Sequence, residues 1–71
     1  MKNRVREMRE QMGVTQAELG RLAGVSRQAV NAIERGKYVP SIRLAYALSR
    51  IFQCSIEELF LFEEGGENEK E

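Results

Sequence analysis

Apolar residues recur three or four positions apart along most of the chain, and this spacing predicts amphipathic α-helices. The first helix is expected over about residues 2–12, with Val5, Met8 and Met12 on its buried side. Later segments predict two helices within residues 16–35, a fourth from residue 42 and a short fifth from residue 56. Their expected core residues include Ile42, Ala45, Leu48, Ile51, Phe52, Ile56, Leu59 and Phe60. No useful strand-like alternation occurs, so an all-α fold with five helices is predicted.

Residues that favour helix ends separate these segments. Thr15 is followed three positions later by Glu18, a capping-box pattern in which each side chain bonds to the backbone of the other. Ser55 and Glu58 repeat that pattern before the fifth helix. The other expected boundary residues are Gly13, Gly24, Ser26, Gly36 and Ser41.

Residues 16–35 have the pattern of a helix-turn-helix, a motif that places its second helix in the major groove of DNA. Gly20 and Ala23 are small enough for two short helices to cross closely. Gly24 suits the turn because glycine adopts a left-handed conformation at little cost. Apolar residues expected to seal one helix against the other are Leu19, Leu22, Val25, Val30 and Ile33.

The composition indicates one small domain, expected over residues 1–62, and argues against an enzyme. The 71 residues include no histidine, no aspartate and a single cysteine, Cys54, so an internal disulfide is impossible and no catalytic set or metal-ligand spacing is present. No metal, cofactor or small-molecule ligand is expected. No signal peptide or membrane-spanning run is visible, so a cytoplasmic location is expected, with association to the nucleoid through DNA.

The zero net charge conceals two oppositely charged segments. Residues 1–52 hold ten Lys and Arg side chains and four glutamates, a balance of +6. Residues 53–71 hold seven glutamates and one lysine, a balance of −6. The basic part suits a phosphate partner, and residues 63–71 are expected to form a disordered acidic tail. That tail either folds back over the basic face and weakens nonspecific DNA binding or serves only solubility.

Further short segments add to the motif: GVTQ at residues 13–16, ERGK at 34–37, PS at 40–41 and SIEELF at 55–60. With these, residues 2–60 resemble the lambda-repressor-like helix-turn-helix family, often called Xre-like. Two positions differ from its usual pattern. Gly20 stands where the family more often has alanine, at an expected cost of about 1 kcal/mol in helix propensity. Gln53 stands where glycine is frequent, with strain expected after the fourth helix.

The resemblance implies a compact five-helix domain that binds double-stranded DNA. In that architecture Arg27, Gln28 and Asn31 are expected to read base edges, since such side chains pair with guanine or adenine. Residues expected near phosphates are Gln16, Ser26, Arg35, Lys37 and Tyr38. Gln16 is also expected to brace Gln28. For Arg35 and Lys37 the alternative is an ordinary solvated charge.

The resemblance also implies a structural role for Arg9 and Glu34, which occupy positions used for an internal ion pair in similar repressors. This pair is expected to hold the end of the recognition helix against the first helix. Removing one partner would leave an uncompensated charge.

Small members of this family usually bind DNA as twofold dimers. Residues 59–62, LFLF, are more apolar than a small monomer should expose, so Leu59, Phe60, Leu61 and Phe62 are the expected homodimer interface. The alternative is that they close the core. The predicted function is a transcriptional regulator, most plausibly a repressor at a palindromic operator. A protein-interaction module, antitoxin-like with secondary DNA binding, is the competing hypothesis.

Overall fold

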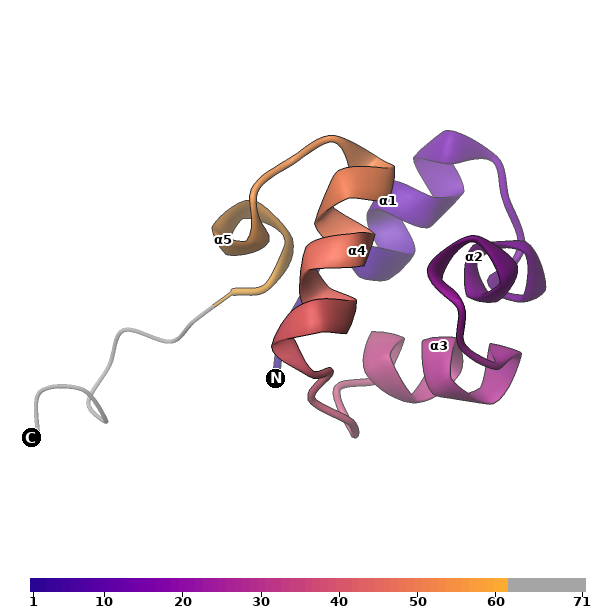
Figure 1. The fold of residues 1–71 in the computed structure, drawn as a ribbon, viewed down its shortest axis with the longest axis horizontal. Coiled ribbons are helices and arrows are strands. Elements are labelled where there is room, and N and C mark those ends of the chain that lie inside the picture. The colour runs from indigo at the N-terminus through magenta and orange to yellow at the C-terminus, as the bar shows by residue number, and fades with distance from the viewer. Residues whose placement is uncertain (62–71) are drawn as a thin grey trace, which may run out of the picture.

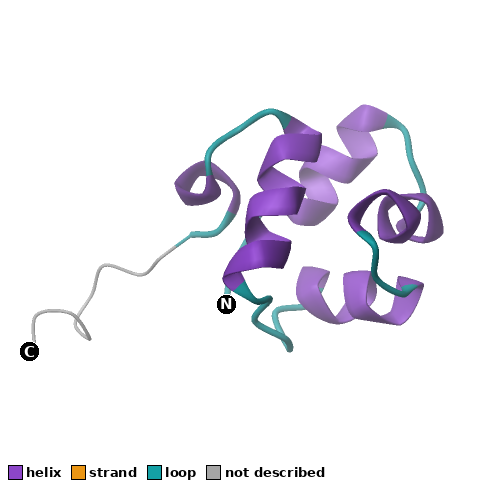
Figure 2. Ribbon diagram, in the orientation of Figure 1, coloured by secondary structure: helices purple, strands orange, loops and turns teal. Residues whose placement is uncertain are grey.

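A computed structural model describes residues 1–61, which form five α-helices and no strand (Figures 1 and 2). The helices are α1 (Val5–Met12), α2 (Gln16–Ala23), α3 (Arg27–Glu34), α4 (Ile42–Phe52) and α5 (Ile56–Leu59). The all-α prediction is confirmed. In Figure 1, α2 is seen almost end-on whereas α3 runs across the view, so the two helices cross steeply.

The predicted hydroxyl caps form at the starts of four helices. Thr15 Oγ1 accepts a hydrogen bond from the Glu18 backbone N–H at 3.0 Å, and a Glu18 carboxylate oxygen accepts from the Thr15 N–H at 2.8 Å. Ser26, Ser41 and Ser55 cap α3, α4 and α5 with the same side-chain acceptor geometry. These caps satisfy amides that would otherwise lack a partner, so the helix starts are set locally.

Left-handed residues follow four of the helices, with Gly36 after α3 at φ of +75°, and one of the four is not glycine. Gly13 after α1 and Gly24 after α2 both have φ of +81°. Gln53 ends α4 with φ of +57° and is the sole non-glycine residue with positive φ in residues 1–61. The strain expected from replacing glycine at this position is therefore present in the backbone.

The N-terminal residues correct the predicted start of α1. Residues 2–4 are not helical and run beside residues 59–61 instead. The Arg4 N–H donates to the Leu59 carbonyl at 2.8 Å, and the Leu61 N–H donates to the Lys2 carbonyl at 2.9 Å. Asn3 then opens α1, because its side-chain oxygen accepts from the Val5 N–H at 3.0 Å. The contact with residues 59–61 is distant in sequence and could not be seen in local spacing.

The core lies between all five helices. Its buried apolar residues are Val5, Leu19, Val30, Ile33, Leu44, Ala45, Leu48, Leu59 and Phe60. Three residues expected inside are exposed: Met12 at 45%, Leu22 at 58% and Ile42 at 76%. Each lies in a terminal turn of its helix. Helical spacing predicts the buried side but not how far the neighbour extends.

Residues 59–62 were expected to supply a dimer interface, and the structure assigns the first two to the core instead. Leu59 is 0% exposed and Phe60 is 2% exposed, so neither side chain is available to a second molecule. They close the core at the α5 end. Leu61 is exposed, and Phe62 lies outside the described residues, as does the predicted tail.

Candidate nucleic-acid interface

The turn between α2 and α3 depends on close backbone contact. The Gly20 carbonyl accepts from the N–H groups of Gly24 at 2.8 Å and Val25 at 2.9 Å. A Cβ added to Gly20 would lie 2.6 Å from the Val25 carbonyl oxygen, a distance that requires the backbone to shift. Gly20 therefore allows the turn to sit directly on α2. Gly20 was expected to allow a close backbone approach despite its low helix propensity, and the group that approaches it is the Val25 carbonyl in the turn.

This turn sets the position of α3, whose two sides differ in burial. Val30 and Ile33 are each 1% exposed and face the core. Arg27 and Gln28 in the first turn are exposed, and Asn31 is half-buried one turn further along. Positions 27 and 28 lie four and three residues before position 31, so both are neighbours of position 31 on the helix surface. The three predicted base-reading residues thus share an outer face of α3.

Four of the five predicted phosphate-contacting residues lie at or near the two ends of α3. Ser26 Oγ accepts from the Ala29 N–H at 3.0 Å, which leaves the hydroxyl hydrogen available to donate. Arg35, Lys37 and Tyr38 are exposed at the end of α3 and in the loop that follows. No carboxylate among residues 1–61 forms an ion pair with Arg35 or Lys37. These cations are therefore not neutralised by the described part of the chain.

Gln16 begins α2 and makes a different contact from the one expected. Its side-chain N–H donates to Glu34 Oε1 at 3.1 Å. The expected brace between Gln16 and Gln28 is absent from the described hydrogen bonds. The side-chain oxygen of Gln16 is not used in this contact, and the residue lies beside Asn31 and Arg35 in a depression described below.

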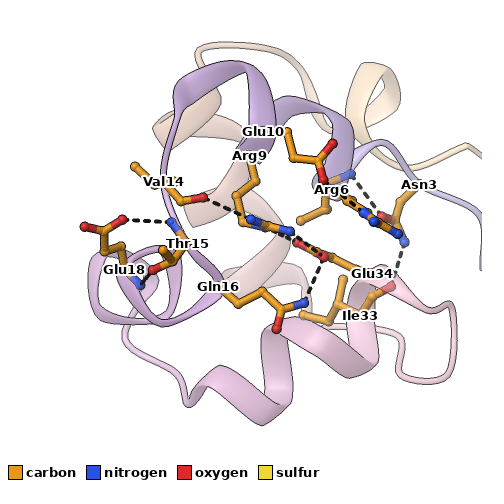
Figure 3. A network of polar contacts seen from close by, with 11 residues as sticks. Asn3, Arg6, Arg9, Glu10, Val14, Thr15, Gln16, Glu18, Ile33 and Glu34 are labelled. Atoms are coloured by element: carbon orange, nitrogen blue, oxygen red, sulfur yellow. Dashed lines mark hydrogen bonds and ion pairs between the residues drawn. The ribbon is translucent and has the colours of Figure 1, made fainter.

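A buried polar network connects α1, α2 and α3 (Figure 3). Arg9 Nε lies 2.6 Å from Glu34 Oε2, and Arg9 Nη2 lies 3.3 Å from Oε1. Arg9 Nη1 also donates to the Val14 carbonyl at 3.0 Å. The side chains of Arg9 and Glu34 are only 13% and 3% exposed. Donation of hydrogen bonds to Glu34 raises the pKa of the Arg9 guanidinium.

Beside this network is a basic depression of about 360 Å³, lined by Arg6, Arg9, Gln16, Asn31, Glu34 and Arg35. It brings a base-reading candidate, Asn31, next to two phosphate candidates. Arg6 was not predicted to take part. Its partner Glu10 lies 3.2 Å away, and both side chains are largely exposed, so the pair contributes at most about 1 kcal/mol and opens easily. Arg6 and Arg9 are three positions apart on α1, and this spacing could have indicated that Arg6 lies beside Arg9.

The chain's similarity to known proteins agrees with this geometry. A family model described as helix-turn-helix matches residues 5–59. The chain belongs to the helix-turn-helix family. A relative described as an uncharacterized HTH-type transcriptional regulator, from Archaeoglobus fulgidus, is 47% identical over 64 residues, covering 90% of this chain and 91% of the relative.

Two solved structures share this helix-turn-helix fold. The P22 c2 repressor, determined in complex with a synthetic operator, matches with a TM-score of 0.79 and 35% identity, covering 84% of this chain and 91% of that one. The restriction-modification controller protein C.AhdI from Aeromonas hydrophila matches with a TM-score of 0.72 and 33% identity, covering 80% and 83%. The predicted lambda-repressor-like fold is confirmed. The family consists of DNA-binding transcription regulators and is not an enzyme family.

Residues 1–61 hold no group of three Cys, Asp or Glu side chains placed to bind a metal ion. None of the described helices has the length and apolar character needed to cross a membrane. Cys54 is half-buried, and its thiol donates to Met8 Sδ at 3.8 Å. Burial raises the pKa of this thiol, which favours the unreactive protonated form.

Proposed function

We propose that this helix-turn-helix regulator binds a near-palindromic operator as a homodimer and acts as a repressor. The observation that carries the proposal is the outer face of α3, where Arg27, Gln28 and Asn31 lie together outside the core. Arginine can donate two hydrogen bonds to guanine, and glutamine or asparagine can pair with adenine. Each such contact is worth about 1–3 kcal/mol of discrimination between bases.

Phosphate contacts would orient α3 in the major groove. Gln16 and Ser26 stand at the starts of α2 and α3, where backbone N–H groups have no partner within the helix and favour anions. Arg35, Lys37 and Tyr38 would contact the backbone beyond the other end of α3. Such contacts supply affinity and register but carry no sequence information.

A second subunit would double the length of the site. In twofold helix-turn-helix dimers the recognition helices lie about 34 Å apart, one turn of DNA, and the operator is nearly symmetric. Leu61 is the described member of the expected interface that remains exposed, at 40%. Ile42 and Tyr46, one turn apart on α4, are further exposed apolar residues that a partner could cover. A dimer of this kind would act in the cytoplasm, at the nucleoid.

Selection of binding sites from a random duplex library tests the proposal. The purified protein should enrich a near-palindrome at physiological salt. Gln28→Ala should relax the sequence at one symmetric pair of positions, whereas Gln11→Ala, the same substitution on an exposed residue of α1, should leave the site unchanged.

Other outcomes of this selection would contradict parts of the proposal. An enriched site without symmetry would reject the dimer. Failure of a folded protein to enrich any sequence would reject sequence-specific binding and favour the protein-interaction module.

A further inference from the structure

The described chain ends beside the end of α3. Leu61 is held there by its hydrogen bond to the Lys2 carbonyl, at 2.9 Å. Asn3, next to Lys2, donates from its side chain to the Ile33 carbonyl at 2.9 Å. Leu61 also borders a depression of about 440 Å³ that is lined by Met1, Lys2, Asn3, Glu34, Arg35 and Gly36. The segment after residue 61 therefore begins next to the proposed DNA-binding surface.

The surface at this point is positively charged. Lys2, Arg35 and Lys37 are exposed, and no carboxylate among residues 1–61 forms an ion pair with them. The nearby acidic residue Glu34 is 3% exposed in its side chain and is neutralised by Arg9. We call Lys2, Arg35 and Lys37 the basic exit surface.

The segment that leaves from this surface has the opposite charge. Residues 62–71 contain five glutamates and one lysine, a balance of −4. Ten residues reach about 33 Å when extended, whereas a helix of the length of α3 spans about 12 Å. The segment is thus long enough to lie along the whole of α3. Its attachment to the same chain gives it an effective concentration of about millimolar at that surface.

We propose that residues 62–71 bind the basic exit surface and compete there with DNA phosphates. This regulation rests on the proposed DNA-binding function of the same surface. Because DNA of any sequence must displace the segment, the segment lowers affinity for all duplexes by the same factor. The ratio of operator affinity to nonspecific affinity is unchanged, and fewer molecules are held on nonspecific DNA.

The first experiment uses the full chain with glutamines in place of Glu63, Glu64, Glu67, Glu69 and Glu71. Binding to a fluorescent 20-base-pair duplex of arbitrary sequence is measured at two salt concentrations. At 50 mM salt the variant should bind about 3- to 10-fold more tightly than the parent chain, and at 300 mM the difference should fall below about 1.5-fold. Equal affinities of the two proteins at 50 mM salt would overturn the proposal.

A single substitution on α5 controls for long-range charge effects. Glu57 is exposed but lies outside the acidic segment. Glu57→Gln should change the duplex affinity by less than about 1.1-fold at 50 mM salt, below the per-charge gain of about 1.25- to 1.6-fold in the five-residue variant. A gain per charge equal to that of the five-residue variant would reject local binding of the segment.

A double-variant comparison locates the contact. In an Arg35→Gln background, the five glutamine substitutions should increase duplex affinity by a smaller factor than in the parent chain, because part of the segment's partner is already removed. The same factor in both backgrounds would exclude Arg35 from the contact and reject the assigned surface.

Amide chemical shifts measured without DNA separate this proposal from the proposed function. The parent chain and the five-glutamine variant should differ at Lys2, Arg35, Gly36 and Lys37 at 50 mM salt but not at 300 mM. Absence of these differences would overturn segment binding even if the protein reads DNA. Their presence in a protein that binds no DNA would support segment binding and reject the DNA-binding function.

Discussion

Polar side chains on the two sides of α3 have different roles: on the inner side they hold the fold together, and on the outer side they are exposed. On the inner side, Glu34 is almost fully buried and binds Arg9 and Gln16, while Val30 and Ile33 fill the core. On the outer side, Arg27 and Gln28 are exposed and have no described side-chain hydrogen bond within residues 1–61. A polar residue near a DNA-binding surface therefore serves recognition only where its donors and acceptors are left available.

The comparison predicts that changes on the inner side alter stability and changes on the outer side alter DNA preference. Glu34→Ala should have the largest effect on stability, because it leaves the guanidinium of Arg9 buried without its partner. The expected loss is about 3–5 kcal/mol in the free energy of unfolding. Urea denaturation followed by circular dichroism measures this loss.

Two further variants sharpen this prediction. Replacing both partners, with Arg9→Met and Glu34→Ala, should recover part of the lost stability because no buried charge remains uncompensated. Gln28→Ala should change the free energy of unfolding by less than about 0.5 kcal/mol, as expected for an exposed residue. A Glu34→Ala protein of unchanged stability and altered sequence preference would contradict the division between the two sides.

Gly20→Ala tests the contact that sets where α3 begins. Helix propensity alone predicts a gain of about 1 kcal/mol. The added methyl group would instead meet the Val25 carbonyl, so we expect a loss of about 1–3 kcal/mol and weaker operator binding. Ala17→Gly on the exposed side of α2 is the matched control for propensity and should lose about 1 kcal/mol. A more stable Gly20→Ala protein would show that the turn adjusts freely.

Gln53→Gly tests a strained turn at the end of α4. Glycine removes the cost of the left-handed conformation but increases the entropy of the unfolded chain, so a net gain of about 0.5–1 kcal/mol is expected. Thermal denaturation should show a higher Tm, with operator affinity unchanged. Gln53→Ala retains the backbone strain and should not be stabilised. A loss of stability on Gln53→Gly would mean that the glutamine side chain contributes more than the strain costs.

Glu18→Ala should have the smallest effect, and that effect should depend on pH. The backbone N–H of Thr15 lowers the pKa of Glu18 from its ordinary value of 4.5. The contribution of Glu18 is therefore fully present above pH 4.5 and is lost as the pH falls through the lowered pKa. The variant should melt about 2–4 °C below the parent at pH 7, and this difference should shrink as the pH is lowered below 4.5. A constant difference across this range would exclude the ionised cap.

Local sequence patterns were sufficient to predict four helix starts and the outer face of α3. The hydroxyl caps at Thr15, Ser26, Ser41 and Ser55 act within three residues of themselves, so their signals do not depend on the rest of the fold. The positions of Arg27, Gln28 and Asn31 followed from helical spacing once the start of α3 was known.

Local patterns missed some features that depend on contacts distant in sequence, whereas the Arg9–Glu34 ion pair, expected from the family resemblance, is present. Residues 2–4 pair with residues 59–61, and this pairing moved the start of α1. The side chain of Gln16 contacts Glu34, which lies eighteen positions away, rather than Gln28. The close approach at Gly20 was expected, but its partner, the Val25 carbonyl in the turn, was not identified from the sequence.

The hydroxyl caps favour rapid folding of the newly synthesised chain. Four of the five helices begin at a signal contained in a few neighbouring residues, so these helices can start to form before the chain has found its distant contacts. Small helical domains dominated by local contacts fold in about microseconds to milliseconds. A newly made copy would then reach its folded form much faster than a ribosome adds the next residue, leaving synthesis rather than folding to limit the supply of regulator.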